Sequence, residues 1–171
     1  MKIIFMGTPK FAVPTLKAIY DSGHKILEVY TQPAAKSGRG QKFNLSGISK
    51  CAKKLNLKVR SPDTLETIQE INHIKKLKPD LVVVVAYGKI LPQKLLNIDK
   101  LIFINAHASL LPKWRGAAPI QRAIMNMDSE TGVSIMKIVP QLDAGPVMLQ
   151  GKIKISQEMS YENLSKKMSE I

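Results

Sequence analysis

Cysteine is nearly absent from this sequence: Cys51 is the one cysteine among 171 residues. Because a disulfide needs two thiols, these residues cannot form an internal disulfide, and so low a count is typical of proteins from a reducing compartment. We therefore expect a cytoplasmic protein. No His or Asp lies beside Cys51 in the sequence, so a partly buried, small side chain is a better interpretation of it than a reactive thiol.

Long hydrophobic runs are also missing at the start of the chain. The apolar run in MKIIFMGTPK lasts five residues before a Gly-Thr-Pro turn, which is too short for a signal peptide core or a membrane span. The overall hydrophobic content of 44% argues against disorder. We expect a soluble, unexported protein whose residues 1–171 form one ordinary domain.

Acidic residues are scarce: 13 Asp and Glu stand against 26 Lys and Arg, giving a net charge of +13. Such an excess favours polyanionic partners, although a lysine-rich composition spread over solvated faces gives the same total. The distribution is more informative, because no acid lies between Glu28 and Asp63. That interval contains Lys36, Arg39, Lys42, Lys50, Lys53, Lys54, Lys58 and Arg60.

Apolar strand-like runs alternate with helix-like stretches along the chain, a pattern typical of βαβ units. The predicted fold class is α/β, with a Rossmann-like open, mainly parallel twisted sheet and helices on both faces. We expect strands at 2–6, 26–31, 81–86, 101–105, 133–139 and 147–155, the last two antiparallel. We expect helices after Pro9, from Asp63 to Leu77 with a capping box at Asp63 and Glu66, over 116–127, and from Ser160 onward. Residues 32–45 are predicted to be a loop.

Ligands bind beyond the carboxyl ends of the strands in an open parallel sheet. Three predicted strand ends carry suggestive residues, namely Gly7-Thr8-Pro9, Ala86-Tyr87-Gly88 and Asn105-Ala106-His107.

Asn105 and His107 are two positions apart in an extended segment, so their side chains can point to the same side. An amide beside an imidazole is a plausible hydrogen-bond donor with a general acid or base. A turn cap and a structural histidine explain the same two residues, and both interpretations stay open at this point. The following segment, 109–116, could form an apolar wall for a flat ligand, although its Trp114 could equally be a core residue. Asp143 lies in a turn, where it is either a turn former or a carboxylate brought beside His107.

These motifs resemble those of the folate-dependent formyltransferases. The resemblance rests on Asn105-Ala106-His107-Ala108-Ser109-Leu110-Leu111-Pro112, on Arg115-Gly116, and on Thr131-Gly132 followed by Asp143-Ala144-Gly145. It covers essentially the whole chain. Within the family, Phe5-Met6-Gly7-Thr8-Pro9, Thr31-Gln32-Pro33, Gly38-Arg39-Gly40 and residues 113–122 resemble the members whose acceptor is methionyl-tRNA.

The resemblance implies an enzyme that transfers the formyl group of 10-formyltetrahydrofolate to the α-amino group of methionyl-tRNA, for translation initiation. It implies a catalytic trio of Asn105, His107 and Asp143. It further implies that the folate is bound by Ser109, Leu110, Leu111, Pro112, Tyr87 and Gly88. The basic loop would bind tRNA through Arg39, Lys36 and Lys42, and the turn Gly7, Thr8 and Pro9 would lie at the acceptor site.

The turn at Gly7 lacks the G-x-G-x-x-G fingerprint, so a nucleotide cofactor is not expected, and Gly7 and Pro9 could simply form a tight turn. No metal site is predicted, and we expect a monomer. The family adds a C-terminal β-barrel domain that is not found in this sequence, and we expect the catalytic domain to be cut short within a helix at Ile171. The alternatives are a family member with glycinamide ribonucleotide or an amino sugar as acceptor, a hydrolase releasing formate, or a nucleic-acid-binding module without catalysis.

Overall fold

The structure is a computed structural model that describes residues 1–37, 42–156 and 158–171. The backbone divides into two compact units, Met1–Ile102 and Phe103–Ile171. Fully buried apolar side chains occur in both units, for example Phe5 and Leu16 in the first and Leu164 in the second. None of the helices in the described ranges is long and apolar enough to cross a membrane.

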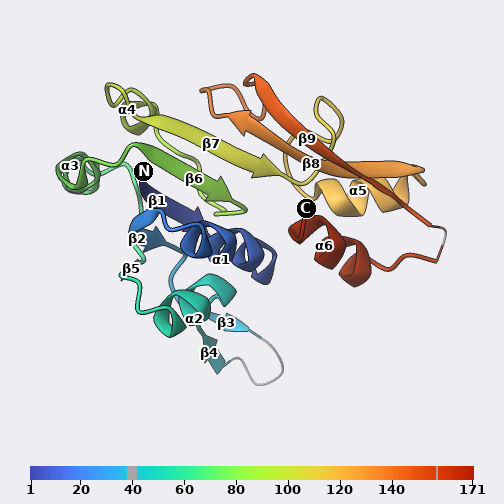
Figure 1. Ribbon diagram of the computed structural model, residues 1–171, viewed down its shortest axis with the longest axis horizontal. Coiled ribbons are helices and arrows are strands. Elements are labelled where there is room, and N and C mark those ends of the chain that lie inside the picture. Colours follow the sequence, from blue (N-terminus) through green and yellow to red (C-terminus); the bar gives the residue numbers. More distant parts are fainter. Residues whose placement is uncertain (38–41, 157) are drawn as a thin grey trace. The chain divides into compact units, whose positions relative to one another are not determined.

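The first unit is built on four parallel strands in the order β5-β2-β1-β6 (Figure 1). Their bounds are Lys2–Gly7 for β1, Lys25–Tyr30 for β2, Val59–Arg60 for β5 and Leu81–Val85 for β6. Phe5 of β1 pairs with Val29 on one side and Val83 on the other, so β1 lies in the middle and its residues 3–7 are buried. Because the strands are parallel, their carboxyl ends lie at one edge of this sheet.

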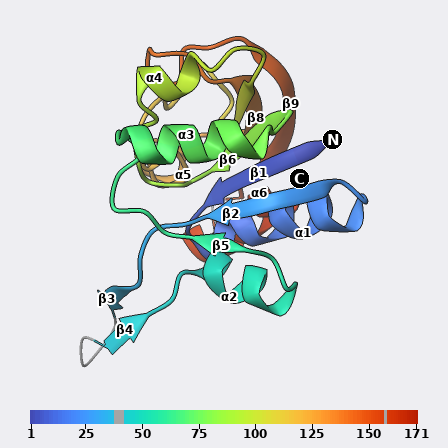
Figure 2. The same ribbon diagram turned by 90° about the vertical axis from the view of Figure 1, so that its left-hand side faces the viewer.

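Helices cover both faces of these strands. The helices of the first unit are the 3₁₀ helix η1 (Lys10–Ala12), α1 (Val13–Asp21), α2 (Gly47–Lys54), α3 (Ile68–Leu77) and α4 (Gln93–Leu96). Figures 1 and 2 show α1 on one side of β1 and β2 and α3 on the other. The strand order runs outward from β1 in both directions, and connections of the usual hand then place helices on opposite faces of the sheet. The predicted α/β fold class is confirmed.

The start of α3 differs from the prediction. The helix begins at Ile68 rather than near Asp63, and Thr67 is its N-cap, with the Thr67 hydroxyl accepting a hydrogen bond from the Glu70 backbone N–H. Thr67 and Glu70 have the same spacing as the capping pair expected at Asp63 and Glu66. Two equivalent signals therefore competed in the sequence, and the second one starts the helix.

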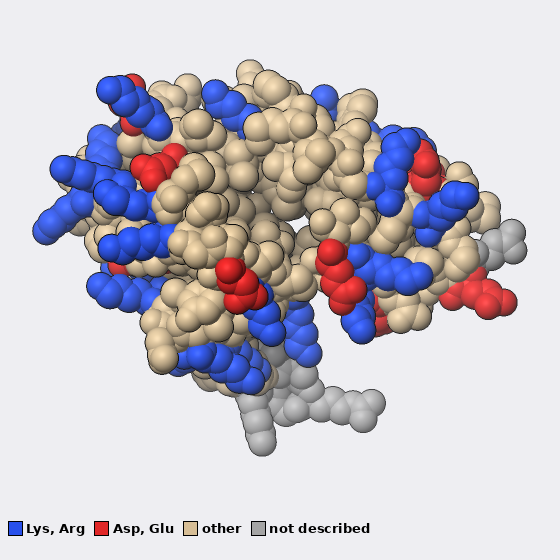
Figure 3. Space-filling view, viewed as in Figure 1, with Lys and Arg blue, Asp and Glu red and all other residues tan. Residues whose placement is uncertain are grey.

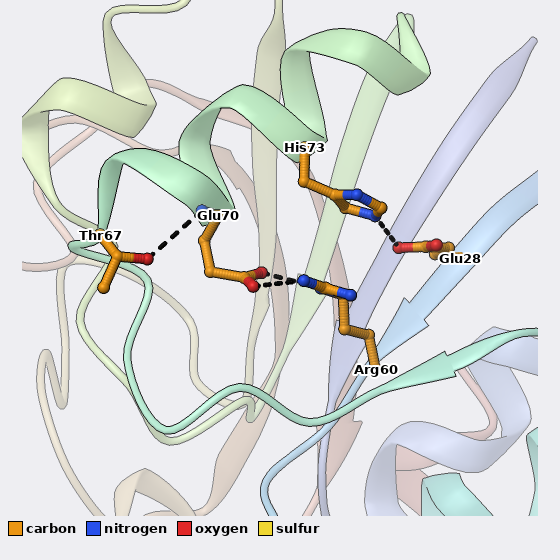
Figure 4. A network of polar contacts seen from close by, with 5 residues as sticks. All are labelled: Glu28, Arg60, Thr67, Glu70 and His73. Atoms are coloured by element: carbon orange, nitrogen blue, oxygen red, sulfur yellow. Dashed lines mark hydrogen bonds and ion pairs between the residues drawn. The ribbon is translucent and has the colours of Figure 1, made fainter.

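A polar network ties α3 to the sheet (Figure 4). Arg60 at the end of β5 donates from Nε to Glu70 Oε2 at 2.9 Å and forms a second bond to the same carboxylate. The Arg60 guanidinium holds the pKa of the Glu70 carboxyl below its ordinary value. On the next turn of α3, His73 Nε2 lies 2.8 Å from Glu28 Oε2 on β2. Two hydrogen-bonded pairs therefore fix this helix against the neighbouring strands β5 and β2.

Residues 32–45, predicted to be a loop, contain two short strands. β3 (Ala35–Ser37) pairs antiparallel with β4 (Lys42–Asn44), forming a small hairpin separate from the main strands. Three-residue strands carry too little apolar periodicity to be distinguished from a loop in the sequence.

The second unit is an antiparallel meander of three strands, β7 (Ile102–His107), β8 (Glu130–Lys137) and β9 (Val147–Lys154). The expected antiparallel relation of the last two strands is confirmed. Its helices are α5 (Pro119–Met125) and α6 (Tyr161–Ser169), and Ser160 caps α6 by accepting from the Asn163 backbone N–H. Pro119 occupies the first turn of α5, as expected, but the helix is shorter than residues 116–127. Ala118 before it has a left-handed backbone with φ +56°, which prevents an earlier start.

Candidate active site

The end of β7 presents Asn105 and His107 on one face of the second unit. They are directly opposite Met136 and Ser134 of β8, respectively. Residues two apart in a strand share a face, so the same-side placement expected from the sequence is confirmed. The Asn105 side chain forms no hydrogen bond with the part of the chain that the structure describes, which leaves its amide N–H groups available to a ligand.

His107 is held between two acceptors. Its Nδ1 lies 3.5 Å from Asp143 Oδ2, and its Nε2 lies 2.9 Å from the Trp114 carbonyl oxygen. Only 6% of the residue is exposed, so water competes little for either nitrogen. Because a carboxylate and a carbonyl can only accept, both ring nitrogens can donate at once when the imidazole is protonated. The two acceptors fix the orientation of the imidazole ring.

Asp143 is placed by the turn between β8 and β9. Its φ of +45° lies in the left-handed region, which Asp tolerates better than most residues. The turn closes tightly, since a Cβ built on Gly145 would lie 1.8 Å from the Lys137 carbonyl oxygen. Asp143 Oδ2 accepts a hydrogen bond from the Gly116 backbone N–H at 2.8 Å. The carboxylate is therefore both a turn element and a partner of His107, so the two interpretations of Asp143 hold together.

The segment predicted to contact folate, Ser109 to Pro112, directly follows β7. Ser109 donates from its hydroxyl to the Lys113 carbonyl at 2.6 Å and from its backbone N–H to the His107 carbonyl at 2.9 Å. Both Ser109 and Leu111 are buried, whereas Pro112 is exposed. The segment is a tight, internally bonded turn, and its position next to the histidine is the one expected from the sequence.

Ser134 and Gln150 support this turn, and the sequence interpretation missed both. The Ser134 hydroxyl donates to the Ser109 carbonyl at 2.6 Å and accepts from the Leu111 backbone N–H at 3.0 Å. Gln150 of β9 donates from Nε2 to Ser134 Oγ at 2.9 Å and to the Leu111 carbonyl at 3.1 Å. In the sequence, Ser134 and Gln150 stand out only as isolated polar residues within the apolar runs of strands that follow the candidate site. Cross-strand pairing at His107, Ser134 and Gln150 then joins them in one row.

Trp114 is anchored away from the histidine ring. Its indole Nε1 donates to Asp128 Oδ2 at 2.7 Å. Burial alone would raise the pKa of the Asp128 carboxyl, but hydrogen bonds from Asn126, Trp114 and Lys113 outweigh it and lower the pKa below the ordinary value. The backbone of Trp114, rather than its ring, contacts His107. The half-buried indole therefore orients the carbonyl that His107 uses.

Residues of the first unit that are predicted to contact the acceptor and the folate also lie together. Gly7 ends β1, and the Thr8 hydroxyl donates to the Tyr87 carbonyl oxygen at 2.8 Å. Tyr87 itself is 2% exposed, and burial raises its pKa to about 12. Tyr87 can therefore offer a ligand its backbone but not its ring, while Gly88 has a positive φ of +83°. Their roles as ligand-binding residues stay predictions.

The predicted tRNA-binding residues lie in or beside the β3–β4 hairpin. Lys36 belongs to β3 and Lys42 to β4, whereas Arg39 lies outside the described residues. The hairpin is well exposed at Phe43, where 72% of the side chain surface is accessible. Figure 3 shows Lys and Arg side chains over many parts of the visible face, so positive charge is not confined to this hairpin.

Two depressions in the described surface are unsuited to a folate. One, of about 230 Å³, lies in the second unit beside Leu110, Trp114 and Gln150, and this is below the roughly 300–1,000 Å³ of ligand clefts. The other, of about 680 Å³, lies in the first unit around Asp80, at the amino end of β6. Ligands of open α/β sheets bind at the carboxyl ends, so its size does not make it the active site.

No group of three or more His, Cys, Asp and Glu side chains is placed to hold a metal ion within residues 1–37, 42–156 and 158–171.

The fold and the site together define an α/β protein with an Asn-x-His pair at a strand end and an aspartate paired to the histidine. The model of the formyl transferase family matches the chain over residues 1–171. The chain belongs to the formyl transferase family. It is 56% identical to the methionyl-tRNA formyltransferase of Pelagibacter ubique, over 98% of this chain and 54% of that protein. It is 49% identical to the methionyl-tRNA formyltransferase of Sulfurihydrogenibium, over 99% of this chain and 55% of that protein. The chain thus spans about half the length of the curated relatives it matches.

Solved structures of phosphoribosylglycinamide formyltransferases share the fold. Those from Bacillus halodurans and Streptococcus pneumoniae match with TM-scores of 0.78 and 0.79, at 20% and 18% identity. The first match covers 98% of this chain and 87% of the Bacillus halodurans protein. The second covers 99% of this chain and 91% of the Streptococcus pneumoniae protein. At these identities the likeness shows the fold alone.

Proposed function

We propose that the protein transfers the formyl group of 10-formyltetrahydrofolate to the α-amino group of the methionine on methionyl-tRNA. The observation that carries the proposal is the 3.5 Å distance between His107 Nδ1 and Asp143 Oδ2. His107 lies two residues beyond Asn105, whose side-chain amide has no hydrogen-bond partner among the described residues. The relatives at 47–56% identity that are named methionyl-tRNA formyltransferases support the choice of acceptor. We further propose that the protein acts in the cytoplasm as a monomer.

In the proposed reaction the amine nitrogen of methionine attacks the formyl carbon. The new C–N bond forms as the bond between the formyl carbon and the folate N10 breaks, and a proton moves from the amine to N10. The products are formylmethionyl-tRNA and tetrahydrofolate. Negative charge builds on the formyl oxygen during attack, and Asn105 would donate an amide N–H to it.

Protonated His107 would be the second donor to this oxygen, and Asp143 would hold its ring. For Nε2 to donate to a substrate it has to exchange the Trp114 carbonyl for the formyl oxygen, while Nδ1 stays on Asp143. Removing one donor to such an oxyanion costs roughly 10²–10³ in kcat. Asp143 would also relay the proton from the amine to the leaving nitrogen, a step worth roughly 10²–10⁴ in rate.

The test is formyl transfer by the 171-residue chain from 10-formyltetrahydrofolate to methionyl-tRNA, with the variant His107→Asn. We expect transfer by the wild type and at least a 10²-fold loss of kcat in the variant. The matched control is His24→Asn, because His24 is exposed and lies outside the site. Equal rates for the wild type and His107→Asn would refute the proposal.

The acceptor is tested in the same assay. Glycinamide ribonucleotide and an amino sugar are offered in place of methionyl-tRNA, and formate release is measured with no acceptor. Transfer to either small molecule, or formate release alone, would overturn the proposed acceptor while keeping the chemistry of the site.

A further inference from the structure

Gln32 lies at a junction of three strand ends in the first unit. It follows β2 by two residues, and its side chain Nε2 donates to the carbonyl oxygens of Tyr87 at 3.2 Å and Gly88 at 3.0 Å. The Thr8 hydroxyl, just after β1, donates to the same Tyr87 carbonyl at 2.8 Å and lies 3.3 Å from the Gln32 backbone N–H. The ends of β1, β2 and β6 are thus tied together by two side chains.

The turn that Gln32 holds has an uncommon backbone. Ala86 has a φ of +47°, in a region that residues with a Cβ rarely adopt, and Gly88 has a φ of +83°. Left-handed backbone at a non-glycine residue is strained and persists when surrounding contacts fix it. A Cβ at Gly88 would lie 2.3 Å from Gln32 Nε2, so the amide packs directly against the backbone of the turn. The contacts that fix this turn come from Thr8 and Gln32.

Both partners of the Gln32 amide are carbonyl oxygens, which can only accept. The carbonyl of Tyr87 receives two donors, and that of Gly88 receives one. A glutamate at position 32 would have nearly the same shape but would place a carboxylate against both oxygens. The arrangement therefore requires an amide N–H group and not merely a side chain of this length.

We propose that Gln32 is a positioning residue for the formyl donor, acting through the turn 86–88. This rests on the proposed function and on the sequence prediction that Tyr87 and Gly88 of that turn bind the folate. Gln32 also directly precedes Pro33 and the β3–β4 hairpin, where the predicted tRNA-binding residues lie. If Gln32 positioned the hairpin, its substitution would weaken tRNA binding. If Gln32 positions the turn 86–88, its substitution weakens binding of the formyl donor.

The experiment measures kcat and the KM of each substrate for the wild type, Gln32→Ala and Gln32→Glu. We expect the KM for 10-formyltetrahydrofolate to rise about 10-fold in Gln32→Ala, since one hydrogen bond of ~1.4 kcal/mol corresponds to that factor. The KM for methionyl-tRNA should change less than twofold. Gln69→Ala, an exposed glutamine on α3, is the matched control.

Two further readouts separate positioning from a general loss of structure. Gln32→Glu should be worse than Gln32→Ala at pH 8, because an ionised carboxylate cannot donate to either carbonyl. Equilibrium binding of tetrahydrofolate, followed without tRNA, should weaken by the same factor as the KM.

The outcomes are distinguishable from failure of the proposed function. If the wild type binds no tetrahydrofolate and transfers no formyl group, the proposed function fails first. If the wild type is active and the Gln32 variants leave the donor KM unchanged, or raise only the KM for tRNA, the positioning role of Gln32 is wrong.

Discussion

Asp143 Oδ2 lies 3.5 Å from His107 Nδ1, although the two residues are 36 positions apart (143 minus 107). The same oxygen accepts the Gly116 backbone N–H at 2.8 Å. One carboxylate oxygen thus fixes both the histidine ring and the chain that follows Trp114, whose carbonyl faces the other ring nitrogen. A change at Asp143 should therefore affect the contacts of both nitrogens of the His107 ring.

Asp143→Asn should lower kcat by roughly 10²–10⁴ while leaving the fold intact. Asn tolerates the left-handed backbone at this position as well as Asp does, but it removes the negative charge that stabilises an imidazolium. The measurement is kcat for formyl transfer between pH 6 and 9, with thermal unfolding as a check on the fold. Asp21→Asn, at an exposed helix end, is the control, and turnover that is intact across this range would exclude a catalytic role for Asp143.

Ser134→Ala should destabilise the protein by about 2–3 kcal/mol. The fully buried hydroxyl bonds to Ser109, Leu111 and Gln150, and its loss leaves buried groups unpaired. Urea unfolding gives the free energy of unfolding, and Ser61→Ala provides an exposed serine for comparison. Surface substitutions usually change the free energy of unfolding by less than about 0.5 kcal/mol. A change that small would show that the turn 109–112 does not depend on this hydroxyl.

Tyr87→Phe should leave the donor KM unchanged and raise the free energy of unfolding by about 1 kcal/mol. The Tyr87 hydroxyl is buried without a hydrogen-bond partner among the described residues, and removing an unpaired buried polar group relieves a desolvation cost. Urea unfolding and the KM for 10-formyltetrahydrofolate are the two measurements. A raised KM would mean that the ring itself touches the folate, contrary to the buried position found here.

Glu70→Gln should destabilise the protein at neutral pH by about 1–2 kcal/mol, because Arg60 loses its charged partner and Arg60 is partly exposed. The pKa of Glu70 is lowered by the Arg60 hydrogen bonds from an ordinary value of 4.5. A lowered folded-state pKa contributes stability that is present above the ordinary pKa and is lost as pH falls through the folded-state pKa.

The difference in unfolding free energy between the wild type and Glu70→Gln should therefore be constant from pH 7 down to about 5 and shrink below the ordinary pKa of 4.5. Urea unfolding at pH 7 and pH 3 measures it. Glu66→Gln, at an exposed position four residues earlier, should show no such dependence. An equal penalty for Glu70→Gln at both pH values would contradict the assigned ion pair.

The sequence by itself determined the α/β class, the central strands and the positions of Asn105 and His107. Unbroken β-branched runs such as Leu81–Val85 have no polar face, so they can only be buried strands, and strand periodicity places residues 105 and 107 on one side. These are local properties of the chain. The motif resemblance added Asp143, which local pattern alone could not separate from an ordinary turn residue.

Tertiary structure decided the rest. The capping box used is the one at Thr67, and Glu70 of the same helix pairs with Arg60, a residue of another element. Ser134 and Gln150 are unremarkable in the sequence, and the motif around Gln32 does not reveal which residues it contacts. All three become important only when the fold brings them to the turns they hold. Hydrogen bonds between residues far apart in the chain depend on strand order and register, and neither is encoded in the spacing of any single segment.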